Sequence, residues 1–113
     1  MSWYTSSQNL NIQLYRGLSA YNKSSGSGYF TTEKEWARQF TQSGRDSEIM
    51  TATISADRIY RQDPLPQAVD QDQVDETVAT AKSKGFAALW VDEGVGEPNS
   101  VLVIDRSVLK RSR

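Results

Sequence analysis

Arg16 is the first residue of this 113-residue chain whose type and position together allow chemistry. It closes an alternating segment whose apolar residues Leu10, Ile12 and Leu14 share its face of a strand, and Gly17 follows it. A guanidinium on an inward face needs a partner, because an unpaired buried charge is very unfavourable. Either Arg16 forms an internal ion pair or reaches solvent at the strand's end, or its planar donors hold a pyrophosphate.

A second group of candidate residues is the segment from Gly28 to Thr32. Tyr29 and Phe30 are adjacent, so in a strand they face opposite ways. One ring can join the core while the other lines a cleft and stacks on a flat heteroaromatic ring. Thr31 and Thr32 add hydroxyl groups. The simpler interpretation is the end of a hairpin followed by a helix cap, which requires no ligand.

The acidic segment from Asp92 to Asn99 lies between two apolar segments, where a loop would display carboxylates at the end of a sheet. Glu93 and Glu97 could act there as a general base or could stabilise a developing positive charge. A bound cation is an alternative, but the acidic spacing of a calcium loop is not met, so we expect no metal. The simplest interpretation is a solvated turn.

The overall composition excludes several classes of function. The chain has no His and no Cys, which removes triads built on His, thiol nucleophiles and zinc sites with His ligands. A net charge of -1 gives no strong signal for nucleic acid. No apolar run is long enough to span a membrane, and no signal-peptide pattern opens the chain. We therefore expect a soluble, cytoplasmic protein whose chemistry uses carboxylates, hydroxyls, Arg or Lys.

Two helices are expected to position these residues. Thr32 and Glu35 have the spacing of a capping box, which predicts a helix that starts at Thr32 and ends at Ser43 and Gly44. Its apolar face would consist of Trp36, Ala37 and Phe40. A similar start at Asp70 and a helix-ending glycine at Gly85 predict the second helix.

The strands are expected to form a mixed or antiparallel sheet in a single domain. Besides the segments at Arg16 and Tyr29, alternating or apolar stretches predict strands at 48–54, 87–91 and 101–104, the last of them in the middle of the sheet. Strands and helices do not alternate regularly, which favours a compact α+β fold over a doubly wound one. Residues 1–113 form one domain with its core at about 10–110, and the ends 1–9 and 110–113 are expected to be peripheral and solvated.

Taken together and in this order, the segments resemble small ADP-ribosyltransferase domains. Such domains have an Arg-Gly at the end of the first strand, an aromatic strand ending in Ser or Thr before a helix, and a Glu-bearing segment before a late apolar strand. Here the matching segments are Leu14–Gly17, Tyr29–Thr32 with the following helix, and 94–105. Residues 85–90 also look like the family's Gly-aromatic approach to that region. The resemblance spans about residues 12–110 and implies a split β-sandwich with two main helices.

The resemblance also implies a function: transfer of one ADP-ribose from NAD to a macromolecular target, expected to be a protein, with release of nicotinamide. Arg16 with Gly17 would hold the phosphates or a ribose of NAD, and the absence of His fits the branch of the family that uses Arg here. Tyr29 or Phe30 would stack on nicotinamide, and Thr31 would brace the site. The enzyme would be a glycosyltransferase, of the kind found in bacterial or phage toxins and effectors delivered into a host cell.

The catalytic carboxylate is where the sequence departs from the family pattern. The family's Glu stands directly before the late strand, and that position is Ser100 here. A serine cannot offset the positive charge of an oxocarbenium ion as a carboxylate does. Glu97 is the predicted replacement and Glu93 the alternative. If neither serves, the chain is an inactive NAD-binding or protein-binding module, such as an inhibitor, with the same fold, or a structural domain without a nucleotide.

Overall fold

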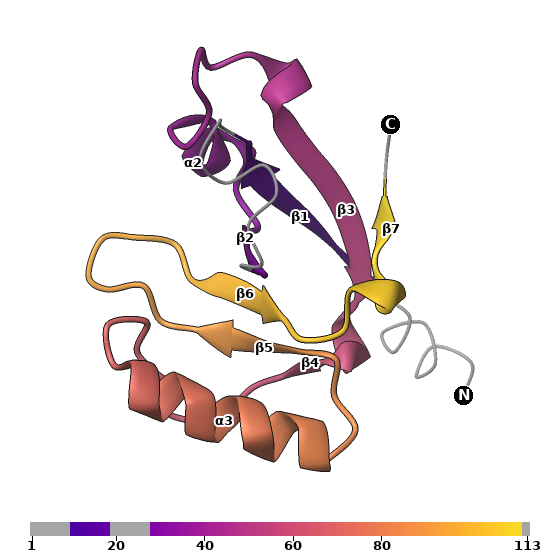
Figure 1. Ribbon diagram of the computed structural model, residues 1–113, viewed down its shortest axis with the longest axis vertical. Helices are drawn as coiled ribbons and strands as arrows, with labels where there is room; N and C mark the ends of the chain where they lie inside the picture. Colours follow the sequence, from indigo (N-terminus) through magenta and orange to yellow (C-terminus); the bar gives the residue numbers. More distant parts are fainter. Residues whose placement is uncertain (1–9, 19–27, 112–113) are drawn as a thin grey trace.

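A mixed sheet of seven strands lies at the centre of the computed structural model, which describes residues 10–18 and 28–111 (Figure 1). The strands are β1 (Asn11–Gly17), β2 (Tyr29–Thr31), β3 (Ile49–Ser55), β4 (Ile59–Tyr60), β5 (Ala88–Val91), β6 (Ser100–Val103) and β7 (Lys110–Arg111). They lie in the order β4-β5-β6-β2-β1-β3-β7. Only β4 and β5 pair in parallel among these, and the other neighbours are antiparallel. The predicted α+β class and mixed sheet are therefore confirmed.

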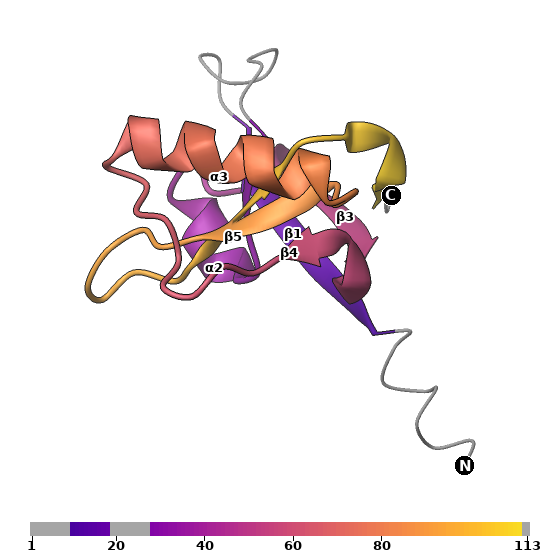
Figure 2. The same cartoon turned by 90° about the horizontal axis from the view of Figure 1, so that it is seen from below.

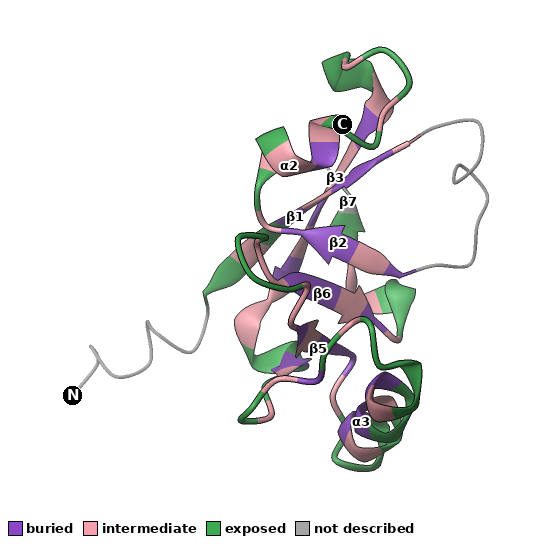
Figure 3. Cartoon of the chain, turned by 90° about the vertical axis from the view of Figure 1, so that its left-hand side faces the viewer, coloured by how far each residue is buried: buried purple, intermediate pink, exposed green. Residues whose placement is uncertain are grey.

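Alternation along the central strands divides the apolar side chains between the two faces of the sheet. Leu14, Phe30 and Val101 belong to the cluster on one face. Leu89 and Val91 belong to the cluster on the other face, where they pack with Val74. The sheet is curled, and its buried residues are concentrated on the central strands (Figure 3). A strand with apolar residues on both faces has to lie inside a sheet, and β6, between β5 and β2, does so as predicted.

The helix α3 (Gln71–Ser83) covers the second face and packs along β5 (Figures 1 and 2). The side chain of Asp70 accepts a hydrogen bond from the backbone N–H of Gln73, at 3.1 Å, and caps the first turn. Gly85 follows the last turn at a φ of 85°, a conformation that glycine adopts without strain. Both predicted ends of this helix are therefore confirmed.

The helix α2 (Lys34–Arg38) is much shorter than predicted. Its N-cap is Glu33 rather than Thr32, and no side chain caps it. The backbone N–H of Glu33 instead donates to the hydroxyl of Thr31, at 3.1 Å, which turns the chain from β2 into the helix. The helix ends at Arg38, before the predicted end at Ser43 and Gly44, because the next residues turn back toward β3.

The two edges of the sheet were not predicted. The two-residue strands β4 and β7 are too short for any periodic pattern, and they exist because they pair with β5 and β3. Lys110 and Arg111 pair with β3 at the edge of the sheet, and Lys110 stays exposed there. Ser112, Arg113 and residues 1–9, which were expected to be peripheral, lie outside the described residues, as do residues 19–27. In the described ranges, no helix has the length and apolar character to cross a membrane.

Candidate functional site

A cavity of about 310 Å³ lies between α2 and the loop that joins β5 to β6. Both flanking segments stand on the same side of the molecule, beside the end of β1 (Figures 1 and 3). Every site residue predicted from the sequence contributes to its wall: Arg16, Gly17, Tyr29, Phe30, Thr31 and Glu97. The other lining residues are Tyr15, Trp36, Ala37, Phe40, Glu93 and Ser100. The fold thus brings together three segments that are far apart in the sequence.

Gly17 allows α2 to approach the end of β1. A Cβ atom at this position would collide with the backbone carbonyl oxygen of Ala37 and would lie 3.0 Å from the carbonyl carbon of Phe40. The backbone φ of Gly17 is not in the left-handed region, so close packing rather than conformation requires the glycine. The Arg-Gly pair therefore has a structural meaning: it ends the strand where the helix forms the cavity wall.

Arg16 is buried, with 9% of its surface exposed. Strand alternation places it with Leu14 and Phe30 on the face of the sheet that holds the first apolar cluster. Burial, and to a smaller extent the charge of Arg106, lowers the pKa of the Arg16 guanidinium. Arginine nevertheless keeps its proton in proteins, so a desolvated positive charge borders the cavity. Such a group favours an anionic ligand.

Tyr29 and Phe30 divide between the two faces as predicted, and the structure distinguishes their environments. Phe30 is 2% exposed and belongs to the core cluster with Leu14 and Val101. Tyr29 is half-buried on the opposite face. Burial first, then the charges of Glu93 and Asp75, raise the pKa of the Tyr29 hydroxyl. The ring of Tyr29 is therefore the better placed of the two to contact a ligand beside Glu93.

A row of hydroxyl-bearing residues crosses the floor of the cavity. Thr31 on β2 lies opposite Tyr15 on β1 and opposite Ser100 on β6. Residues that are directly opposite in neighbouring strands point to the same face, so these three side chains form one line. Thr31 and Ser100 are buried, at 7% exposed each. Because the hydroxyl of Thr31 already accepts from the backbone of Glu33, it holds the start of α2 against the site.

Glu93 and Glu97 both border the cavity, but their surroundings differ. The hydroxyl of Ser100 donates a hydrogen bond to the carboxylate of Glu93, which is half-buried. Glu97 is exposed at the tip of the loop, and its backbone N–H donates to the carbonyl of Gly94 at 3.3 Å. Ser100, where the resemblance to ADP-ribosyltransferases predicts a Glu, thus donates to a carboxylate from seven residues earlier in the chain.

Two aromatic residues of the wall were predicted as helix core and not as site residues. Trp36 and Phe40 meet edge to face, with their ring centroids 6.4 Å apart. Phe40 is 50% exposed and lies beyond the end of α2. Their spacing of four residues is the spacing of a buried helix face, so the sequence offered no signal to separate a cavity wall from a core. Phe40 lines the cavity because α2 ends at Arg38, two residues before it.

The cavity has an aromatic side, a carboxylate side and a cationic end. Trp36, Phe40 and Tyr29 supply rings, Glu93 and Glu97 supply carboxylates, and Arg16 supplies the positive charge. Across residues 10–18 and 28–111, no three acidic side chains gather closely enough to hold a metal ion. A planar cation attached to an anionic group would match these three surfaces.

The chain was also compared with known proteins. No protein-family model, curated protein or solved structure matches it. The function of the chain is therefore inferred from the residues and geometry of the cavity.

Proposed function

We propose that this protein is an NAD-dependent mono-ADP-ribosyltransferase, which transfers ADP-ribose from NAD to a macromolecular acceptor and releases nicotinamide. One observation carries the proposal: the segments around Arg16, Tyr29 and Glu93, distant in the sequence, converge on one cavity. The resemblance to ADP-ribosyltransferases requires this convergence, and the pairing of β1, β2 and β6 produces it. The curled sheet with an apolar cluster on each face also supports a split β-sandwich of the ADP-ribosyltransferase type.

The chemistry of NAD fits the three surfaces of the cavity. Its nicotinamide ring is flat and cationic, and its pyrophosphate is anionic. Tyr29 and the edge-to-face pair Trp36 and Phe40 would face the ring. The guanidinium of Arg16 would hold a phosphate or a ribose hydroxyl. NAD would therefore lie across the end of β1, with nicotinamide beside α2.

Glu93 is proposed as the catalytic carboxylate. When the bond between ribose C1′ and the nicotinamide nitrogen lengthens, its electron pair leaves with nicotinamide and positive charge develops on the ribose. A carboxylate beside the ribose stabilises that charge and can hold a ribose hydroxyl. The nucleophile of the acceptor then forms a bond to C1′ and loses its proton. Ser100 would keep the carboxylate of Glu93 oriented through these steps.

Glu97 remains the alternative carboxylate. It borders the same cavity, and a loop can change its path when a ligand binds. Its exposure makes it better suited to contact the acceptor than to stabilise charge in a site that excludes water, because water screens the interaction. Glu93→Gln and Glu97→Gln variants separate the two assignments.

A second function is supported by one specific observation: Ser100 occupies the position of the expected Glu. In this alternative the protein is an NAD-binding or inhibitory module that retains the cavity without turnover. It would bind NAD with the same rings and the same guanidinium. Only the transferase proposal includes a protein acceptor. It also places the activity in the cytoplasm, including the cytoplasm of a host cell.

Incubation of the protein with NAD tests both functions. A transferase releases nicotinamide, and binding of NAD to the native state raises the melting temperature. Arg16→Ala should abolish both signals. Glu76→Gln, a change on the exposed side of α3, is the matched control and should leave both intact. A melting shift without release of nicotinamide, with candidate acceptor proteins present, would support the binding module. If the chain shows neither signal, the transferase and the NAD-binding module are both excluded, and only a module that binds protein without NAD is left.

A further inference from the structure

The wall formed by α2 needs support from outside the helix. Its five residues contain less than two turns, and no side chain caps its start. Helices of this length do not persist by their own hydrogen bonds, because nucleation costs more than so few bonds return. Yet α2 and the turn after it supply Trp36, Ala37 and Phe40 to the cavity. Something must hold this segment in place.

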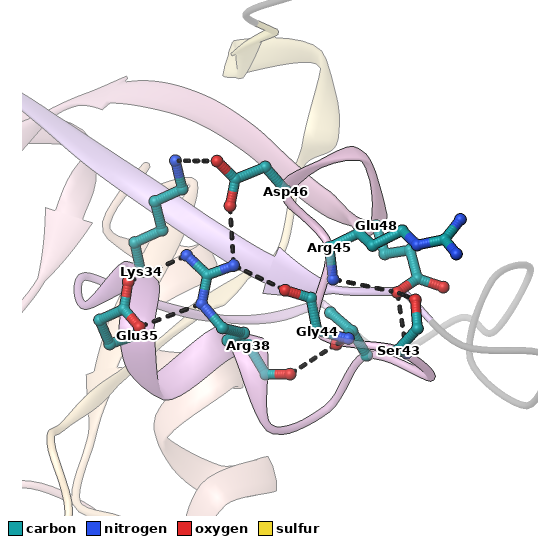
Figure 4. A network of polar contacts seen from close by, with 9 residues as sticks. Lys34, Glu35, Arg38, Ser43, Gly44, Arg45, Asp46 and Glu48 are labelled. Atoms are coloured by element: carbon teal, nitrogen blue, oxygen red, sulfur yellow. Dashed lines mark hydrogen bonds and ion pairs between the residues drawn. The ribbon is translucent and has the colours of Figure 1, made fainter.

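Arg38, the last residue of α2, makes the contacts that can hold it (Figure 4). Its Nε and Nη2 atoms donate to the two carboxylate oxygens of Glu35, at 3.0 and 2.9 Å. Its Nη1 atom donates to Asp46 Oδ1 and to the backbone carbonyl of Gly44, each at 2.7 Å. One guanidinium thus joins the helix to the segment that enters β3. Two-pronged arginine–carboxylate contacts of this kind are stronger and more specific than single surface ion pairs.

The segment that Arg38 holds is itself tied to the end of β1. Glu48 Oε1 accepts from the backbone N–H and the hydroxyl of Ser43, at 2.9 and 2.7 Å (Figure 4). The backbone carbonyl of Glu48 accepts from the N–H of Leu18, at 2.7 Å, directly after Gly17. A continuous path of hydrogen bonds therefore runs from Arg38 through the 43–48 turn to the strand that carries Arg16.

We propose that Arg38 is a positioning residue for the ligand-binding cavity. It fixes the aromatic wall relative to the end of β1 without lining the cavity itself. The substrate that this wall would contact is NAD, so this part of the inference rests on the proposed function. The fixed wall holds the nicotinamide ring before the bond to ribose breaks. Loss of Arg38 therefore weakens the binding of NAD and leaves the chemical step unchanged.

Steady-state kinetics with NAD provide the first test. Arg38→Met keeps much of the side chain's length and removes the charge and the donors. It should raise the KM for NAD about 5- to 10-fold, the scale of one lost charged contact, with kcat within about twofold of the parent. Arg38→Lys should recover part of the loss. Arg61→Met, at an exposed position after β4, is the control and should change neither constant. An unchanged KM in Arg38→Met would overturn the positioning role.

Hydrogen exchange separates failure of this inference from failure of the proposed function. The N–H groups of Ala37, Phe40 and Thr41 donate to backbone carbonyls within or just before α2 and the following turn. Arg38→Met should lower their protection about 10-fold or more without ligand, while protection in α3 stays unchanged. If the parent does not use NAD but this protection falls, Arg38 positions the wall of a cavity with another ligand. Unchanged protection would contradict the inference whatever the ligand.

Discussion

The hydroxyl of Ser100, the first residue of β6, donates a hydrogen bond to the carboxylate of Glu93 at the start of the β5–β6 loop. Ser100 begins β6 opposite Thr31, so its position is set by the sheet. Glu93 comes from the loop and is held there by this contact. Ser100 cannot act as a carboxylate itself, but its hydrogen bond holds the carboxylate of Glu93 beside the cavity.

Exchange of each glutamate for glutamine is predicted to have unequal effects on catalysis. Glu93→Gln should lower kcat for release of nicotinamide by about 100-fold or more, because the developing positive charge loses its carboxylate. Glu97→Gln should retain activity within about fivefold, since an exposed carboxylate acts through screened electrostatics. Nicotinamide release by each variant, with melting temperature as a check on folding, decides the assignment. The reverse order of effects would make Glu97 the catalytic residue.

Removal of the serine hydroxyl is predicted to weaken catalysis through Glu93. Ser100→Ala should lower kcat about 10-fold, in line with the loss of one hydrogen bond to a charged group. The combined variant with Glu93→Gln should be no less active than Glu93→Gln alone, because Ser100 acts through that carboxylate. Activities of the two single variants and the double variant provide the measurement. Fully additive losses would show that Ser100 has a separate role.

Leucine substitutions of the two adjacent aromatic residues are predicted to separate binding from stability. Tyr29→Leu should raise the Kd for NAD about 3- to 10-fold, the scale of one lost ring contact, with a modest effect on unfolding. Phe30→Leu should lower the free energy of unfolding by about 1–2 kcal/mol because its ring fills the core. Calorimetric titration with NAD and urea unfolding measure the two quantities. A larger Kd for Phe30→Leu than for Tyr29→Leu would contradict the assignment.

Alanine at Gly17 is predicted to displace α2. The new Cβ would collide with the carbonyl of Ala37, so the free energy of unfolding should fall by about 1–3 kcal/mol and the Kd for NAD should rise. Gly85→Ala is the control: its left-handed φ makes alanine cost about 1 kcal/mol, far from the cavity. Only Gly17→Ala should alter the affinity. Equal affinities in the two variants would show that α2 tolerates the shift.

The contacts of Arg38 predict a loss of stability in acid. Hydrogen bonds from Arg38 are the main cause of the lowered pKa values of Glu35 and Asp46, whose ordinary values are 4.5 and 3.8. Because the native pKa lies below the unfolded one, this stabilisation is present above the ordinary values and is lost as the pH falls through the lowered ones. Urea unfolding between pH ~2 and ~5 should therefore show a shallower acid slope for Arg38→Met than for the parent. Parallel slopes would exclude this linkage.

Much of the fold and part of the site could be predicted from local patterns. The alternation that leads to Arg16 is a strand, and the side chain of Asp70 caps a helix that ends before Gly85. Both depend on near neighbours in the chain, which periodicity and capping describe directly. The start of α2 was predicted wrongly, because the hydroxyl of Thr31 accepts from Glu33 and moves the cap by one residue.

The sequence by itself determined the central strands, α3 and the residue types available for chemistry. Tertiary structure decided which of them meet. The strands β4 and β7 exist only through their partners, and the wall around Phe40 depends on the turn that Arg38 holds. The surroundings of Glu93 and Glu97 differ because of the path of the loop between β5 and β6 and one hydrogen bond from Ser100. Such long-range contacts are set by strand pairing and packing across the sheet. Local patterns of residue types in the sequence therefore do not predict them.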